Sequence, residues 1–156
     1  MGPQVRQTAG EVGVTTVFRA VLDANVFVSA AIHPGGPPGR IIEQFLRTHA
    51  FTLVLSGAIV EEVMRALAYP KVRRHVRRGL DPGLWMEDLV VLADFVLDPI
   101  QVPGVSKDPD DDKYLAAAIA GRASLVVTGD PHLLTVGEYD GVRIVTPRAF
   151  LNLLSA

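Results

Sequence analysis

From residue 17 onward, short runs of β-branched and other apolar residues alternate with longer stretches of helical periodicity. Four of the short runs are expected strands, at residues 17–22, 51–55, 125–128 and 142–145. Strands that alternate with helices are typical of βαβ units, in which the strands lie parallel. The sequence therefore predicts an α/β domain with a central, mostly parallel sheet. A length of 156 residues suits one such domain better than two.

Helix starts are marked by a capping side chain followed by proline at the first helical position. Such pairs at residues 81–82, 108–109 and 146–147 are expected to begin helices. Helices are expected after the turn at residues 34–39, over residues 57–68, from 82 through 96, over 109–120 and over 147–154. Residues 1–16 show no apolar period, so we expect a flexible tail before a domain at residues 17–156.

Composition excludes several kinds of site. The chain contains no cysteine, which excludes disulfides, thiolate catalysis and zinc–sulfur sites. Its net charge of -2 is not that of a strongly basic nucleic-acid-binding domain. No apolar run is long enough to cross a bilayer, and residues 1–16 lack the apolar stretch of a signal peptide. We therefore expect a cytoplasmic protein that makes no membrane contact.

Asp23 is the sharpest single signal in the sequence. It is the only charged residue between Ala20 and Ile32, and it directly follows the first expected strand. A carboxylate at the edge of a core needs hydrogen bonds, a cation or a metal ion. Capping of the helix that starts near Val26 is the structural alternative. We favour a functional role, because ligands of parallel sheets bind beyond the carboxyl ends of the strands.

Other acidic residues are open to both interpretations. Asp130 follows the third strand, but Asp130-Pro131 is also a good helix start. The acidic run at residues 108–112 suits the first turn of a helix, although four carboxylates within five residues exceed what capping requires. Glu61 and Glu62 both lie off the apolar face of their helix, and periodicity does not distinguish them.

Residues 71–78 form the one basic run. Its cations are Lys71, Arg73, Arg74, Arg77 and Arg78. A solvated helix face explains them nearly as well as a track for nucleic-acid phosphates, so both interpretations stay open. The histidines show no metal-ligand spacing and are expected to be ordinary surface or packed residues: His33, His49, His75 and His132. The sequence contains no P-loop, GxGxxG motif or nucleophile elbow.

Four blocks of sequence, in this order, resemble a PIN domain. They are LDANV at residues 22–26, Ser56 followed six residues later by Glu62, DPDDDKYL at 108–115, and VTGD at 127–130 with Leu133-Leu134 behind it. The resemblance extends from Phe18 to the C-terminus. It implies a three-layer αβα sandwich, and it is strongest to the toxin components of toxin–antitoxin pairs related to VapC.

The resemblance also implies a set of site residues. The catalytic and metal-binding acids would be Asp23, Glu62, Asp111 and Asp130. Asn25 and Thr128 would support the first and last of these carboxylates by hydrogen bonds. Only the family register selects Glu62 over Glu61, and Asp111 over its acidic neighbours. Asp108 and Asp112 are candidate outer acids.

The implied activity is metal-dependent hydrolysis of RNA. Mg²⁺ or Mn²⁺ would be the cofactor, and cleavage would leave a 5′-phosphate and a 3′-hydroxyl. RNA, a cognate antitoxin and a second copy of the chain in a homodimer are the implied partners. One alternative is a PIN-fold module that binds RNA or a partner without catalysis. Another is an acidic α/β phosphatase, which would require a second aspartate where this chain has Asn25.

Overall fold

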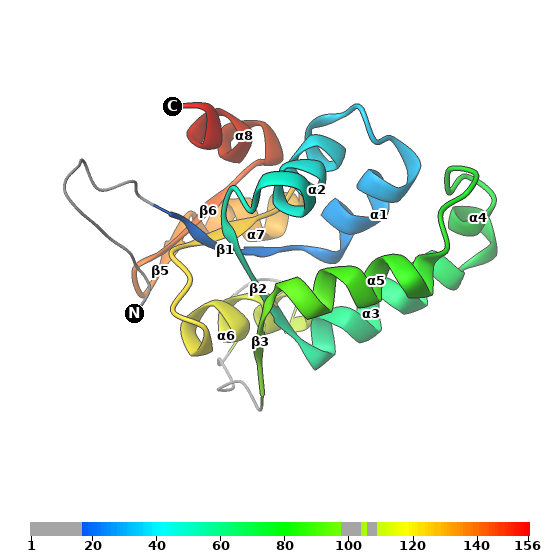
Figure 1. Cartoon of the computed structure of the whole chain (residues 1–156). Helices are drawn as coiled ribbons and strands as arrows, with labels where there is room; N and C mark the ends of the chain where they lie inside the picture. The colour runs from blue at the N-terminus through cyan, green and yellow to red at the C-terminus, as the bar shows by residue number, and fades with distance from the viewer. Residues whose placement is uncertain (1–16, 98–103, 106–108) are drawn as a thin grey trace.

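The computed structural model describes residues 17–97, 104–105 and 109–156, and a mixed six-stranded sheet lies at its centre (Figure 1). The strands are β1 (Arg19–Leu22), β2 (Thr52–Ser56), β3 (Asp94–Val96), β4 (Leu125–Val127), β5 (Glu138–Tyr139) and β6 (Val142–Val145), in the order β3-β2-β1-β4-β6-β5. Every pairing is parallel except that of β5 with β6. The predicted α/β class with a mostly parallel sheet is confirmed, whereas the expected tail at residues 1–16 lies outside the described residues.

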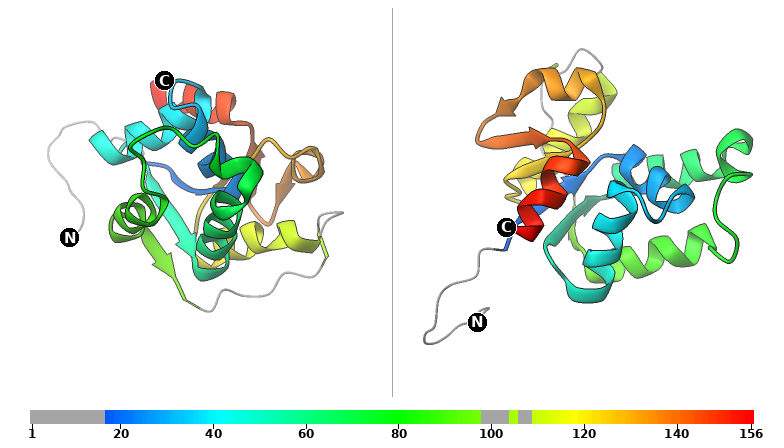
Figure 2. Two further views of the ribbon diagram at one scale, coloured as in Figure 1. Left: turned by 90° about the vertical axis from the view of Figure 1, so that its right-hand side faces the viewer. Right: turned by 90° about the horizontal axis from the view of Figure 1, so that it is seen from above.

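Helices cover both faces of the sheet, which gives the three-layer αβα arrangement. They are α1 (Ala24–Ile32), α2 (Pro37–Thr48), α3 (Gly57–Ala68), α4 (Pro70–Arg73), α5 (Pro82–Leu92), α6 (Asp112–Ala120), α7 (Pro131–Val136) and α8 (Pro147–Ser155), with a 3₁₀ turn, η1 (Pro109–Asp111), before α6. In Figure 1 and in the left view of Figure 2, α2 and α8 lie above the sheet and α6 lies below it. Within the described ranges, no helix has the length and apolar character needed to cross a bilayer.

The core is built on the two central strands and a group of aromatic rings. All side chains of β4, and those of Ala20, Val21 and Leu22 in β1, are buried. Phe51, just before β2, packs edge-on against Phe150 of α8 with ring centroids 5.0 Å apart, and it also contacts Phe45 of α2. Such edge-to-face pairs add about 0.5–1.5 kcal/mol each to the burial of the rings. They fix α2 and α8 on one face of the sheet.

Two of the expected helix caps, Asp81 and Thr146, are confirmed, whereas Asp108 lies outside the described residues. The side chain of Asp81 accepts a hydrogen bond from Leu84 N at the start of α5, and Thr146 does the same for Ala149 N at the start of α8. Proline occupies the first turn in both helices. Asp81 therefore has a sufficient structural explanation.

The structure corrects the prediction in one segment and adds to it in another. The helix expected to run through Val96 ends at Leu92, and its buried face is made by Trp85, Met86 and Leu89. Residues 94–96 instead form β3, which pairs in parallel with β2. The short strand β5 is an addition to the four expected strands. Both β3 and β5 have only two or three residues, too few for an alternating pattern to be visible in the sequence.

Candidate active site

The candidate site lies where β1 and β4 end side by side. Leu22 of β1 is in register with Val127 of β4. A polar residue directly follows each of them, Asp23 after β1 and Thr128 after β4. The backbone N–H of Asp23 donates to Val127 O at 2.9 Å, which ties the two strand ends together. The chain passes from β1 to β2 on one side and later adds β4 on the other. This is the switch point at which parallel sheets bind ligands.

Asp23 is buried, with 3% of its surface exposed. Its Oδ2 accepts a hydrogen bond from the Thr128 hydroxyl at 2.6 Å, and its Oδ1 accepts one from the backbone N–H of Asn25 at 3.1 Å. Burial raises the pKa of Asp23 above its ordinary value, and the nearby charge of Glu62 raises it further, while these hydrogen bonds oppose the shift. Asp23 is thus a carboxyl group whose ionised form would be stabilised by a cation.

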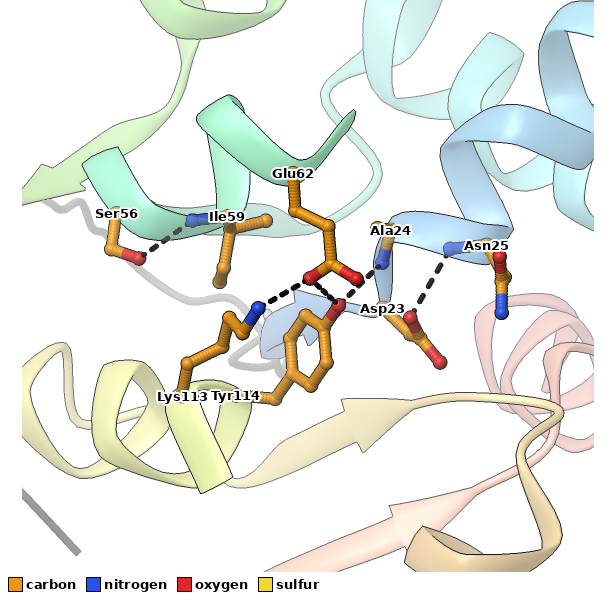
Figure 3. A network of polar contacts seen from close by, with 8 residues as sticks. All are labelled: Asp23, Ala24, Asn25, Ser56, Ile59, Glu62, Lys113 and Tyr114. Atoms are coloured by element: carbon orange, nitrogen blue, oxygen red, sulfur yellow. Dashed lines mark hydrogen bonds and ion pairs between the residues drawn. The ribbon is translucent and has the colours of Figure 1, made fainter. Parts of the chain in front are cut away.

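Of the two glutamates in α3, Glu61 is exposed. Glu62 instead points toward Tyr114 and Lys113, on the side of α3 that faces Asp23 (Figure 3). Its Oε1 accepts hydrogen bonds from Lys113 Nζ at 2.7 Å and from the Tyr114 hydroxyl at 2.6 Å. Both donors come from the first turn of α6. The structure therefore distinguishes two glutamates that the sequence pattern leaves equivalent, and it does so through contacts more than 50 residues away in the chain.

Tyr114 is a functional candidate that the sequence pattern does not single out, and it connects three elements. Its oxygen accepts a hydrogen bond from Ala24 N at 3.3 Å and donates one to Glu62. Burial, and then the charge of Asp23, raise the pKa of the Tyr114 hydroxyl, so it stays a donor at neutral pH. The only signal in the sequence is a hydroxyl-bearing ring two residues after the acidic run, at the start of the apolar part of its helix.

Asp111 and Asp130 lie close to each other. A side-chain hydrogen bond with Asp111 is the main cause of a lowered pKa of Asp130, and the His132 backbone N–H and side chain contribute in the same direction. The backbone N–H of Asp130 donates to Thr128 Oγ1 at 2.9 Å. The Thr128 hydroxyl thus donates to the carboxylate of Asp23 and accepts from the backbone N–H of Asp130. It therefore supports the carboxylate of Asp23 but only the main chain of Asp130.

The other residues proposed from the sequence make different contacts with these acids. Asn25 has an exposed side chain and contacts Asp23 through its backbone N–H. Asp112 is buried, and its Oδ2 accepts a hydrogen bond from Val105 N at 3.3 Å. Asp108 lies outside the described residues. His132 lies unexpectedly close, with Nδ1 4.0 Å from Asp130 Oδ1.

The basic run begins at the far end of α3. From Glu62 to the last residue of α3, Ala68, the helix rises by about 9 Å. Lys71 and Arg73 belong to α4, and Arg73, Arg77 and Arg78 line a groove of about 700 Å³ next to it. Arg77 differs from the other cations because its guanidinium donates to Ala30 O at 2.5 Å and its backbone N–H donates to Ala31 O. Arg77 therefore anchors this segment to α1.

Comparison with protein families identifies the chain. The family model described as PIN domain matches residues 19–132, from the start of β1 to the second residue of α7. The chain belongs to the PIN domain family. The matched region contains all the acids discussed above, and the resemblance inferred from the four sequence blocks is confirmed.

Similar proteins are found both by sequence and by fold. The uncharacterized protein MJ1680 of Methanocaldococcus jannaschii is 26% identical over 148 residues, which cover 86% of this chain and 90% of the relative. The crystal structure of PAE2754 from Pyrobaculum aerophilum has a TM-score of 0.56 at 16% identity, covering 89% of this chain and 90% of that one. VapBC2 from Rickettsia felis, solved bound to a DNA fragment from their promoter, has a TM-score of 0.53 at 11% identity, covering 83% and 98%. The solved structures share the fold.

PIN domains are generally nucleases that use divalent metals. The donor atoms of this PIN domain are of the kind that binds such metal ions. Carboxylate oxygens converge at the strand ends, and Mg²⁺ and Mn²⁺ prefer oxygen ligands. Burial is the main cause of the raised pKa of Asp23, and repulsion from the charge of Glu62 raises it further. A divalent cation would relieve that repulsion. Within the described residues, Asp111 and Asp130 bring ligand atoms within 4.8 Å of each other, and Asp23 and Glu62 are not part of that group.

Proposed function

We propose that this PIN domain is a Mg²⁺- or Mn²⁺-dependent endoribonuclease and the toxin of a toxin–antitoxin pair. One observation carries the proposal: hydrogen bonds hold four carboxylates from four separate segments near the carboxyl ends of β1 and β4. Thr128 links Asp23 to the backbone of Asp130, and Tyr114 links Glu62 to the start of α1. Asp111 completes the set through its hydrogen bond with Asp130.

Hydrogen bonds from neighbouring residues would orient the carboxylates of the site. Thr128 and the Asn25 N–H fix both oxygens of Asp23, and Tyr114 fixes Glu62. The bound metal would activate water and stabilise negative charge on the phosphodiester. No side-chain nucleophile is required, which suits a chain without cysteine.

RNA would approach along the basic segment next to α4. A net charge of -2 gives no general attraction for a polyanion, so a local patch has to supply it. Lys71, Arg73, Arg74 and Arg78 are exposed there, about one and a half turns of α3 beyond Glu62. We assign Arg77 a mainly structural part in this surface, because its guanidinium is engaged with α1.

The toxin role rests on the resemblance to VapC-type proteins and on the similarity of fold to VapBC2. It assigns a cognate antitoxin as the protein partner, a homodimer as the assembly and the cytoplasm as the compartment. A PIN-fold module without catalysis is disfavoured, because the acidic set is complete and its members are held by specific hydrogen bonds.

The test is cleavage of a mixed RNA pool by the full chain. We expect cleavage with Mn²⁺ or Mg²⁺, none in EDTA, and recovery when metal is restored. Asp23→Asn should lower the rate by about 100-fold or more, because it removes a charge from the metal site. Asp81→Asn is the matched control, since asparagine caps helices as well as aspartate does. Wild-type rates in EDTA, or in Asp23→Asn, would refute the metal mechanism.

A further inference from the structure

His132 lies close enough to two of the acids to share a metal ion with them. One ligand atom from each of Asp111, Asp130 and His132 can be chosen so that all lie within 4.8 Å of one another. Ligand atoms about 2.1 Å from an octahedral ion are about 3.0 Å apart when adjacent and about 4.2 Å when opposite. Small side-chain rotations would therefore bring these three atoms to coordination distances.

The local chain geometry fixes this arrangement. Asp130 caps α7, and its Oδ1 accepts a hydrogen bond from the backbone N–H of His132 at 3.0 Å. Pro131 occupies the first turn and restricts the backbone between the two residues. The imidazole therefore lies next to the carboxylate. Its side chain is 55% exposed, so packing in the core does not explain its position.

The other histidines lie elsewhere in the described structure. His33 ends α1, His49 ends α2 and packs against Phe45, and His75 follows α4. His132 is the histidine that the fold brings to the carboxyl end of β4.

We propose that His132 is a nitrogen ligand to the divalent metal held by Asp111 and Asp130, and that it sets the metal preference of the site. The inference rests on the proposed metal centre and adds to it. Imidazole binds transition metals more strongly than it binds Mg²⁺, whose preferred ligands are oxygens. The affinity gained from His132 should therefore grow from Mg²⁺ through Mn²⁺ to Ni²⁺. The site would be tuned toward Mn²⁺-like ions.

Pulsed EPR of the Mn²⁺-loaded full chain, without RNA, detects a coordinated nitrogen directly. We expect ¹⁴N coupling to Mn²⁺ in the wild type and its loss in His132→Ala. His33→Ala replaces another exposed histidine at a helix end and should keep the coupling. Calorimetry provides the second measurement: His132→Ala should weaken Ni²⁺ binding by about tenfold or more and change Mg²⁺ binding by less than about threefold. An unchanged melting temperature would show that His132→Ala folds normally.

The outcomes separate this inference from the proposed function. Mn²⁺ binding without ¹⁴N coupling, or with coupling that persists in His132→Ala, would overturn the role of His132 and leave the metal-dependent nuclease intact. Equal losses of Ni²⁺ and Mg²⁺ affinity would overturn the selectivity. Absence of any Mn²⁺ binding to the wild type would overturn both proposals.

Discussion

Tyr114 and Glu62 are joined by a hydrogen bond of 2.6 Å between the phenol and the carboxylate Oε1. The same phenol oxygen accepts the backbone N–H of Ala24, the residue directly after Asp23 (Figure 3). One buried ring from α6 therefore sets the position of a carboxylate on α3 relative to the start of α1. Tyr114 thereby sets the position of Glu62 relative to Asp23, on which the proposed sharing of a metal ion by these two acids would depend.

Tyr114→Phe tests this positioning role. The variant keeps the ring and leaves Ala24 N and Glu62 Oε1 each without one partner, so we expect a loss of about 1–3 kcal/mol in the free energy of unfolding. Metal affinity should fall by about 10- to 100-fold, as is typical when a partner that orients a ligand is removed. Urea denaturation and Mn²⁺ titration measure the two effects. Tyr139→Phe, in the edge strand β5, is the control. Unchanged Mn²⁺ affinity in Tyr114→Phe would contradict the positioning role.

Lys113 should compete with the metal for Glu62. Its ammonium lies 2.7 Å from Glu62 Oε1 and neutralises charge where a cation would bind. Lys113→Met removes that positive charge, so Mn²⁺ affinity should rise by roughly fivefold, as the electrostatic repulsion of the ion is relieved. Calorimetry with Mn²⁺ measures the change, and Lys71→Met, on exposed α4, should leave affinity unaltered. Weaker Mn²⁺ binding in Lys113→Met would show that the lysine instead organises the site.

Local signals in the sequence are sufficient to predict most of this fold. Helix α3 has the bounds expected from the sequence, residues 57–68, because its apolar period is long and regular. Residues 94–96 give no strand signal, because Asp94 and Phe95 are exposed in an edge strand of three residues. Such a strand buries no alternating face, so only its pairing with β2 defines it.

The candidate site shows the same division between local and non-local information. Asp23 is conspicuous because one charge interrupts an apolar run. Glu62 and His132 have no comparable local signal, since an exposed glutamate and an exposed histidine look the same in sequence as those that face a site. What distinguishes them is contact with α6 and proximity to Asp111, which depend on how distant segments pack.

The arginines next to α4 should separate into two classes. Arg73 and Arg74 are exposed, so replacing both with alanine should weaken RNA binding and reduce the slope of log K against log salt by about one for each phosphate that is no longer neutralised. Arg77→Ala should instead lower the melting temperature, because its guanidinium bonds Ala30 O. Binding titrations from low to high salt measure the slope, with Arg40→Ala as the exposed control. An unaltered slope in the double variant would exclude a phosphate track.

Asp23→Asn should stabilise the metal-free protein, increasingly so as pH rises. The pKa of Asp23 is raised in the folded state, so its protonated form contributes stability below the unfolded pKa of 3.8, and that stability is lost as pH rises through the folded pKa. Asparagine carries no charge at any pH, and the Thr128 hydroxyl can accept as well as donate a hydrogen bond. Melting temperatures from pH 4 to 8 in EDTA should therefore diverge, with the variant above the wild type at neutral pH.

Metal should reverse that order. A ligand that binds only the folded state raises the free energy of unfolding by about 2.7 kcal/mol when its concentration is 100 times its dissociation constant. Mn²⁺ at pH 7 should stabilise the wild type by this amount. It should stabilise Asp23→Asn much less, because the substitution removes a negative charge from the site. Asp81→Asn should follow the wild type in both series, because Asp81 is exposed and only caps α5. A variant that is less stable than the wild type in EDTA at pH 7 would show that the Asp23 carboxylate stabilises the fold by itself, and would remove the electrostatic argument for a cation beside it.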